Sequence, residues 1–160
     1  MAPSLQPVVP VPFAPGNVLR TPSRTITEAD FSAIINVTWE NGPLHTDAEY
    51  MAGTVYGRPI LGGPCLVGIA AGLTSNSMYA AWRAAGLDCY AALGIDEVRY
   101  DAPLFAGDTI HARVLVAELR PTEHGTAYFG EVHDSLLKQD GSVVLRMKRS
   151  YLLKPLEATE

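Results

Sequence analysis

The stretch "RPILGGPCLVGIAAGLTSNSMYAAWRAAGLD", residues 58–88, decides the fold. After its first residue it carries no charge until Arg83, whereas a surface helix carries charges on its solvent face every three or four positions. Gly62-Gly63 leads into the segment, Pro64 suits the first turn of a helix, and Arg83 with Gly86 suits its end. We therefore predict a long helix over this stretch that is buried on all sides.

Two glycines inside the predicted helix need an explanation. Gly68 and Gly72 would each cost roughly 1 kcal/mol relative to alanine in a helix interior. We expect close packing of the helix against a wide, flat surface to compensate for that cost. The strongly apolar part of the helix is too short to span a bilayer, so we expect no membrane partner.

Strand patterns follow the helix to the end of the chain. Apolar and polar residues alternate in "TIHARVLVAELRP", and Asp140-Gly141 is a strong hairpin signal between the last two segments. These patterns predict an antiparallel meander with strands in residues 89–104, 109–121, 126–139 and 143–154. A single apolar helix and such a sheet pack most simply as an α+β domain in which the sheet wraps around the helix.

Two shorter helices are predicted before the long one. "TITEADFSAIINV" starts with Thr27 as an N-cap and has Asp30 three residues later, in a capping-box arrangement. "TDAEYMAG" contains a second set of start and stop signals, with Asp47 or the preceding threonine as the cap. Gly42-Pro43 separates the two helices. The loop between them carries an acid, Glu40, and an imidazole, His45.

Composition excludes several classes of function. The chain of 160 residues is 48% hydrophobic, which fits one compact domain. Its net charge of −5 comes from interspersed acids and bases, so we expect no nucleic-acid partner. Cys65 and Cys89 lack the spacing of metal ligands. We therefore expect no metal site, and we expect reduced thiols in a cytoplasmic protein.

The N-terminal residues 1–22 are rich in proline and form a predicted arm. Six of the twelve prolines precede Ser23, and the segment fits neither a signal peptide nor a spanning helix. The arm is either a loose tail or a segment that packs on a partner subunit through Val8, Val9 and Phe13. A single domain is predicted over residues 23–156, with a tail at 157–160.

The order of these elements resembles the MaoC-like acyl-CoA dehydratases, which have the hot-dog fold and include the R-specific enoyl-CoA hydratases. The motifs that carry the resemblance are "PLHTDAEYMAGTVYG", the "GG" that opens the long helix, and "DEVRYDAPLFAGDTI". The similarity runs from about Thr25 to Pro155. It implies a hot-dog fold, in which an antiparallel sheet wraps around a long central helix.

The hydratases of this family have a loop of the form Gly-Asp-x-Asn-Pro-x-His, and the present chain departs from it in part. Pro43 and His45 match the pattern, whereas Glu40 stands at the aspartate, Trp39 at the first glycine and Gly42 at the asparagine. Many members also have His-Gly before the central helix, where this chain has two glycines.

The resemblance implies that water is added or removed across the α–β bond of a short or branched acyl thioester. Glu40 and His45 would then be the general acid/base pair. Backbone N–H groups of Gly63 and Cys65 at the start of the long helix would stabilise the thioester oxyanion. Alternatives are a hot-dog acyl-CoA thioesterase and a catalytically impaired subunit that only binds acyl thioesters.

Further expectations concern the ligand and the assembly. The partner is an acyl-CoA or acyl-carrier thioester, with CoA as part of the substrate and no separate cofactor. Trp39, Tyr56 and Arg58 are candidates for substrate binding. The resemblance also implies a homodimer or higher oligomer, in which the His-bearing loop of one chain faces the central helix of the other.

Overall fold

The computed structural model describes residues 10–156 as four helices and six strands. In chain order, these are β1 (Val18–Arg20), β2 (Arg24–Thr25), α1 (Glu28–Thr38), α2 (Pro43–Thr46), α3 (Ala48–Ala52), α4 (Gly63–Ala84), β3 (Leu87–Tyr100), β4 (Thr109–Pro121), β5 (Tyr128–Lys138) and β6 (Val143–Pro155). The predicted long helix and the four strands that follow it are all present, although β3 ends at Tyr100, whereas the sequence predicted a strand to residue 104.

One antiparallel sheet holds all six strands, in the order β1-β4-β5-β6-β3, with β2 also paired to β4. Alternate residues of β4 face the core, and Ile110, Ala112, Val114 and Val116 are all buried, as the pattern predicts. Gly141 takes a φ of +83° in the turn between β5 and β6, a value that glycine accommodates without steric cost. The predicted hairpin at this position is therefore confirmed.

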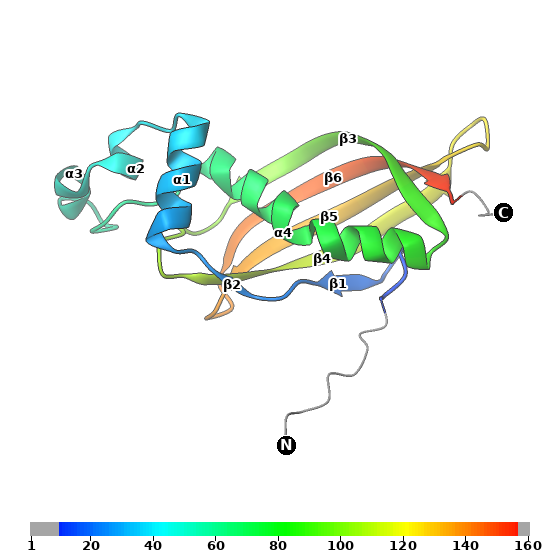
Figure 1. Ribbon diagram of the computed structural model, residues 1–160, viewed down its shortest axis with the longest axis horizontal. Coiled ribbons are helices and arrows are strands. Elements are labelled where there is room, and N and C mark those ends of the chain that lie inside the picture. The colour runs from blue at the N-terminus through cyan, green and yellow to red at the C-terminus, as the bar shows by residue number, and fades with distance from the viewer. Residues whose placement is uncertain (1–9, 157–160) are drawn as a thin grey trace, which may run out of the picture.

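The sheet curves around α4, which lies across its concave face (Figure 1). Two clusters of buried side chains fill the space between them. One lies under the first half of α4 and includes Cys65, Leu66 and Ala70, and the other lies under the second half and includes Met78 and Trp82. The predicted α+β architecture, an antiparallel sheet wrapped around a central helix, is confirmed.

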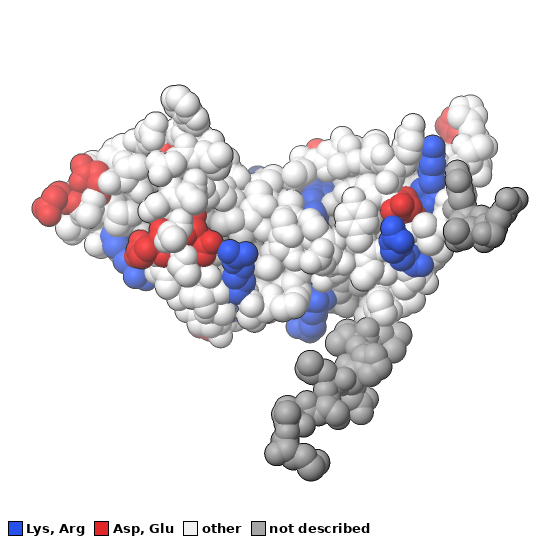
Figure 2. All heavy atoms as spheres, in the orientation of Figure 1, with Lys and Arg blue, Asp and Glu red and all other residues white. Residues whose placement is uncertain are grey.

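The prediction that α4 is buried on all sides is wrong for the single chain. One face of the helix is exposed along its whole length, and it includes Gly68 and Gly72. A Cβ added at either glycine would have no atom within 4 Å. Close packing within the chain therefore does not compensate for these glycines. This face carries no Lys, Arg, Asp or Glu before Arg83 in the last turn of α4, and the middle of the molecule is largely white in Figure 2.

Both predicted short helices are present with their caps. Thr27 accepts a hydrogen bond from the Asp30 amide, and the Asp30 carboxylate accepts one from the Thr27 amide, which completes the capping box of α1. Asp47 caps α3 by accepting from the Tyr50 amide. At the far end of the molecule in Figure 1, α1 lies beside the start of α4, and α2 and α3 extend beyond the sheet.

The N-terminal segment belongs to the domain from an earlier residue than expected. Phe13 is 1% exposed and packs against Trp82 and Gly130 of its own chain, so the prediction that Phe13 packs on a partner subunit is wrong. Strand β1 pairs with β4, which places the start of the domain before residue 23. Val8, Val9 and the tail at 157–160 lie outside the described residues. No helix in residues 10–156 is long and apolar enough to cross a membrane.

Candidate active site

The end of α1 turns Glu40 back toward α4. Trp39 takes a left-handed conformation (φ 60°, ψ 28°), and the amides of Trp39 and Glu40 both donate to the Ile35 carbonyl. This reversal ends the helix and sends the chain toward the first turn of α4. The Glu40 side chain is left 27% exposed.

His45 lies in the short helix α2, whereas the sequence indicated a loop. Pro43 occupies the first turn of α2, which suits a residue without an N–H. Nδ1 of His45 is 2.7 Å from the Ile60 carbonyl oxygen. Because a carbonyl only accepts hydrogen bonds, Nδ1 must carry the proton in this contact, and Nε2 is left to face the site.

Glu40 and His45 are brought together, as the family pattern implies for its acid/base pair. Glu40 Oε2 is 3.3 Å from His45 Nε2, and the imidazole side chain is 14% exposed. Both residues lie at the start of α4 of their own chain, because the Glu40 carboxylate lies directly against Gly62. The expectation that the loop of one chain faces the central helix of another concerns a second chain and stays a prediction.

Gly62 makes room for the carboxylate of Glu40. A Cβ at position 62 would lie 3.1 Å from Glu40 Cδ and 2.6 Å from Glu40 Oε2, and the shorter of these distances is closer than real Cβ contacts allow. Glu40 therefore occupies the space that a side chain at residue 62 would fill. The two departures from the family pattern, a longer acid and a missing side chain before α4, fit each other in space.

Gly63 begins α4 and lies under the ring of Tyr100. A Cβ at position 63 would lie 2.7 Å from both Cε2 and Cζ of Tyr100. Within residues 10–156 the Gly63 and Cys65 amides have no hydrogen-bond acceptor, as expected for the first turn of a helix. The Cys65 side chain is buried, and its Sγ lies 3.3 Å from Thr38 Oγ1, which ties α4 to the end of α1. The sequence contains no signal that places Tyr100 here.

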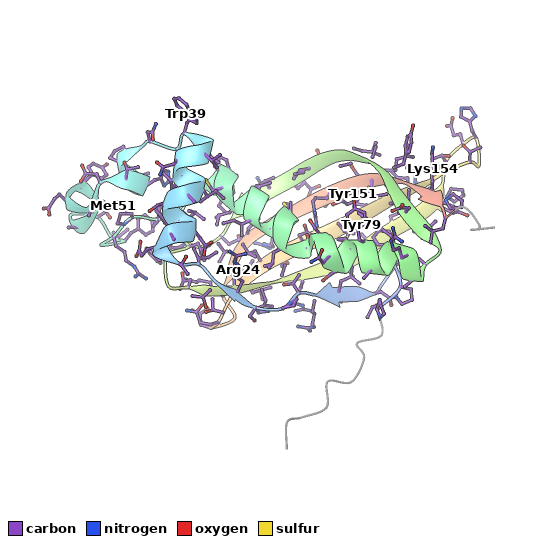
Figure 3. All side chains as sticks on the ribbon, in the orientation of Figure 1. Arg24, Trp39, Met51, Tyr79, Tyr151 and Lys154 are labelled. Carbon is purple, nitrogen blue, oxygen red and sulfur yellow. The ribbon has the colours of Figure 1, made fainter. Side chains whose placement is uncertain are left out.

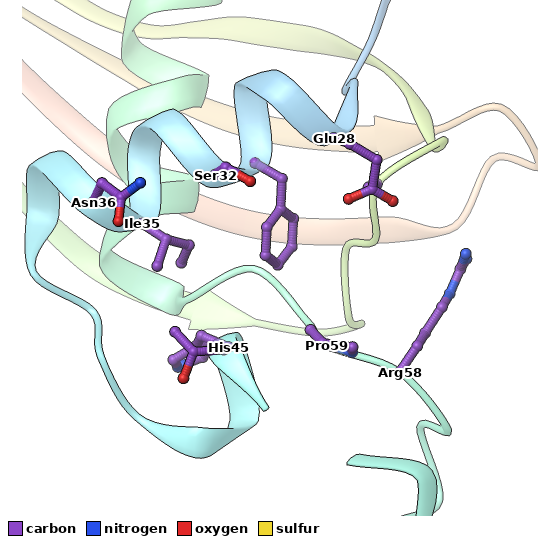
Figure 4. A pocket seen from close by; sticks show the side chains of 10 residues that line it. Glu28, Ser32, Ile35, Asn36, His45, Arg58 and Pro59 are labelled. Carbon is purple, nitrogen blue, oxygen red and sulfur yellow. The ribbon is translucent and has the colours of Figure 1, made fainter. Parts of the chain in front are cut away.

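A cavity of about 320 Å³ opens beside His45, between α1 and the segment that leads into α4 (Figure 4). Its lining includes Phe31, Ile35, His45, Arg58, Pro59 and Ala106. Arg58 is thus near the site, with its guanidinium 4.3 Å from the centre of the Phe105 ring. A larger and more apolar groove of about 890 Å³ runs between α1 and α4 and is lined in part by Ala33, Ile34, Ile69 and Leu73.

The other two substrate-binding candidates lie outside this cavity. Trp39 is 81% exposed and points away from the molecule in Figure 3, because its left-handed backbone turns the side chain outward. Tyr56 is 42% exposed in the segment after α3 and does not line the cavity. The structure therefore brings together Glu40, His45, Gly62, Gly63 and Tyr100, and separates Trp39 and Tyr56 from them.

The chemistry available here is that of proton transfer. Within residues 10–156 there is no group of three or more His, Cys, Asp or Glu side chains that could hold a metal ion. The site offers instead a carboxylate, an imidazole and unpaired amides at a helix N-terminus, where partial positive charge favours an anion. This arrangement is suited to a reaction in which a proton moves and an oxyanion forms.

The fold defines a class of protein, the hot-dog proteins, and sequence comparison identifies the family. The profile described as "MaoC like domain" matches residues 11–135, so the chain belongs to the MaoC-like family. The family and the hot-dog fold expected from the sequence are both confirmed.

Individual proteins agree with this assignment. A solved structure of a monoamine oxidase regulatory protein from Archaeoglobus fulgidus is 28% identical, with a TM-score of 0.79 over 92% of this chain and 97% of that one. The (R)-hydratase from A. caviae involved in PHA biosynthesis has the same fold, at 24% identity and a TM-score of 0.67 over 90% of this chain and 97% of that one. Protein MaoC of Klebsiella aerogenes is 32% identical over 101 residues, which are 62% of this chain and 28% of that much longer protein.

Proposed function

We propose that the protein is a hydratase or dehydratase that adds or removes water across the α–β bond of an acyl thioester. The observation that carries the proposal is the 3.3 Å contact of Glu40 Oε2 with His45 Nε2 beside the first turn of α4. The substrate is an acyl-CoA or acyl-carrier thioester, so CoA enters only as part of the substrate. The cavity of about 320 Å³ at His45 supports a short or branched acyl group.

Hydration needs a base for water and an acid for C2 of the substrate, and the pair supplies both. Since Nδ1 of His45 donates to the Ile60 carbonyl, the pair exchanges protons through His45 Nε2 and the Glu40 carboxylate. The pair starts with one proton shared between its two members. The unprotonated member takes a proton from water while the water oxygen bonds to C3 of the substrate. The protonated member gives its proton to C2. The pair again holds one proton after turnover, and the reverse sequence releases water.

Negative charge grows on the thioester oxygen when water attacks C3. The Gly63 amide is the first candidate to stabilise it, because this N–H is unpaired at the start of α4 and Gly63 is partly exposed. The Cys65 amide is a second candidate. Removing one such donor commonly costs ~10²- to 10³-fold in rate.

We further propose a homodimer in the cytoplasm. Strand β3 forms one edge of the sheet and exposes Tyr90, Leu93 and Ile95, and an apolar edge of this kind is a template for pairing with another chain. The uncharged face of α4 is a second surface that a partner would cover. Both cysteines are free thiols, which supports a reducing compartment.

One assay tests the reaction. The protein is incubated with a panel of enoyl-CoA and 3-hydroxyacyl-CoA esters while the conjugated-enoyl absorbance and the release of free thiol are followed. We expect the absorbance to change without thiol release. Thiol release would indicate a thioesterase instead, and binding without either change would indicate a subunit that only binds acyl thioesters.

Two variants test the residues. Glu40→Gln and His45→Ala are each expected to lower kcat by ~10²- to 10⁴-fold, the usual contribution of a general acid or base. Glu49→Gln and His124→Ala are matched controls, because both side chains are exposed and lie outside the site. Unchanged rates in Glu40→Gln and His45→Ala, with normal folding by circular dichroism, would remove the proposed pair.

A further inference from the structure

Tyr100 lies against the residue whose amide is the first candidate to stabilise the oxyanion. Its ring covers the Cα of Gly63, and the atom that bears the hydroxyl, Cζ, would be 2.7 Å from a Cβ at that position. The hydroxyl end of the side chain is therefore the part closest to the start of α4. Only glycine at position 63 permits this approach.

The end of β3 holds Tyr100 in this position. Tyr100 is in register with Leu145 of β6, and the amide of the next residue, Asp101, donates to the Val144 carbonyl at 2.9 Å. The Asp101 carboxylate accepts two hydrogen bonds from Arg146, at 2.8 and 2.7 Å. The backbone on both sides of the ring is thus tied to β6.

The phenol is free to meet a ligand. Tyr100 is 53% exposed, and its hydroxyl has no hydrogen-bond partner within residues 10–156. On the adjacent residue, Gly62, the missing side chain leaves room for the Glu40 carboxylate. Because residues 62 and 63 are both glycine, the Glu40 carboxylate and the Tyr100 ring can both lie against the start of α4.

We propose that Tyr100 is a further catalytic residue, whose phenol donates a hydrogen bond to the thioester oxygen beside the Gly63 amide. This inference rests on the proposed hydratase function, because it concerns the oxyanion of that reaction. The phenol keeps its proton throughout, and no bond to it is made or broken. It strengthens its hydrogen bond as negative charge grows on the oxygen, so it stabilises the transition state more than the bound substrate.

Tyr100→Phe tests whether the hydroxyl of Tyr100 donates a hydrogen bond or whether its ring only packs against the site. The variant keeps the ring that packs on Gly63 and removes only the hydroxyl. We expect kcat for hydration to fall ~10²-fold with KM little changed, the loss typical of one oxyanion donor. Tyr100→Leu, which removes ring and hydroxyl, should be impaired at least as much. Tyr79→Phe is the matched control, since Tyr79 is an exposed tyrosine near the other end of α4.

A spectroscopic measurement provides a readout that does not depend on turnover. An aryl-enoyl-CoA absorbs at longer wavelength when hydrogen bonds polarise its carbonyl, and Glu40→Gln is expected to slow its hydration. In that background we expect the red shift on binding to shrink when Tyr100→Phe is added and to persist when Tyr79→Phe is added.

The outcomes separate this inference from the proposed function. Hydration by the wild type with an unchanged rate and red shift in Tyr100→Phe would overturn the role of Tyr100 and leave the function standing. A red shift that depends on Tyr100, in a protein that hydrates no thioester of the panel, would support the donor and overturn the hydratase. Absence of any red shift in the wild-type and Glu40→Gln proteins would overturn the donor.

Discussion

At the scale of single residues, a glutamate stands where the family pattern has an aspartate. One extra methylene moves a carboxylate by more than ~1 Å, and a displacement of that size can cost ~10²-fold in an oriented reaction. In this chain the longer side chain lies in the space that Gly62 leaves open, and its carboxylate reaches 3.3 Å from His45 Nε2. Glu40 and Gly62 therefore act as a matched pair.

A double-mutant cycle tests this match. Glu40→Asp withdraws the carboxylate from His45, and Gly62→Ala places a Cβ where Glu40 Oε2 now lies, so each is expected to lower kcat/KM by ~10²-fold. The double variant should be little worse than Glu40→Asp, because aspartate leaves room for the Cβ. Additive losses in kcat/KM would show that the two positions are independent.

The backbone of Trp39, and not its side chain, directs Glu40 toward α4. Its φ of 60° is costly for a residue with a side chain, and glycine, which the family pattern has at this position, adopts it freely. The left-handed turn is needed to direct Glu40 toward α4, whatever side chain residue 39 carries. The exposed indole is therefore not what positions the acid.

At the scale of elements, α1 sets the position of the acid because its C-terminus leads directly to Glu40. Its N-terminus is stabilised by the capping box, in which hydrogen bonds from Thr27, and then the charge of Arg24, hold the pKa of Asp30 below its usual value of 3.8. A group whose pKa is lower in the folded state stabilises the fold above its usual pKa. That contribution is lost as pH falls through the lowered value.

Asp30→Asn tests the cap and its pH dependence. The variant should be less stable than the wild type at neutral pH, and the difference in unfolding free energy should shrink below the usual pKa of 3.8. Urea unfolding from neutral to about pH 3 measures this difference. Glu28→Gln is the control, because Glu28 is also in the first turn of α1 but makes no capping hydrogen bond. A difference that stays constant over the whole range would rule out the carboxylate as its source.

At the scale of the whole molecule, a buried ion pair lies between the two halves of the core. Arg149 Nε is 2.6 Å from Asp134 Oδ2, with side chains 7% and 1% exposed, and Arg149 Nη2 donates to Thr74 Oγ1 of α4 at 2.8 Å. The contact is close but is not aligned as a hydrogen bond, and Asp134 Oδ1 has no partner within residues 10–156. Burial raises the pKa of Asp134, and the charge of Arg149 opposes that shift.

Removing one member of this pair should cost far more than removing both. Arg149→Met leaves Asp134 buried without its cation and is expected to lower the unfolding free energy by about 3–5 kcal/mol. Arg149→Met combined with Asp134→Leu should recover most of that loss, because no charge then remains in the core. Denaturant unfolding of the three proteins measures the difference, and equal stability of the single and double variants would contradict it.

The proposed dimer is also a property of the whole molecule. Lysine in place of Leu93 or Ile95 would bring like charges together where two β3 edges meet, and charged edges oppose pairing between chains. We expect light scattering to give a dimer mass for the wild type and a lower mass for these variants. Leu115→Lys is the control, since Leu115 is exposed on the interior strand β4. A monomeric wild type would overturn the proposal.

Much of the fold could be predicted from local patterns. Three local patterns each predict a backbone conformation that neighbouring residues impose, and each prediction is confirmed. They are the two-residue alternation of β4, the Thr27 capping box and Gly141 in its hairpin. The burial of α4 could not be predicted in this way. The absence of charge predicts that every face of the helix is buried. A face of small uncharged residues also lacks charge, and in this chain such a face is exposed.

By itself, the sequence determined the long helix, the four strands after it and the two capped helices α1 and α3, and that an acid and an imidazole flank a Gly-Pro before the central helix. These features depend on residues close together in the chain, whose steric and hydrogen-bonding preferences act locally. The tertiary structure decided that Glu40 fills the space beside Gly62, that Tyr100 covers Gly63 and that Trp39 points away. Those contacts join segments far apart in the chain, so they are set by how α1, α4 and β3 pack.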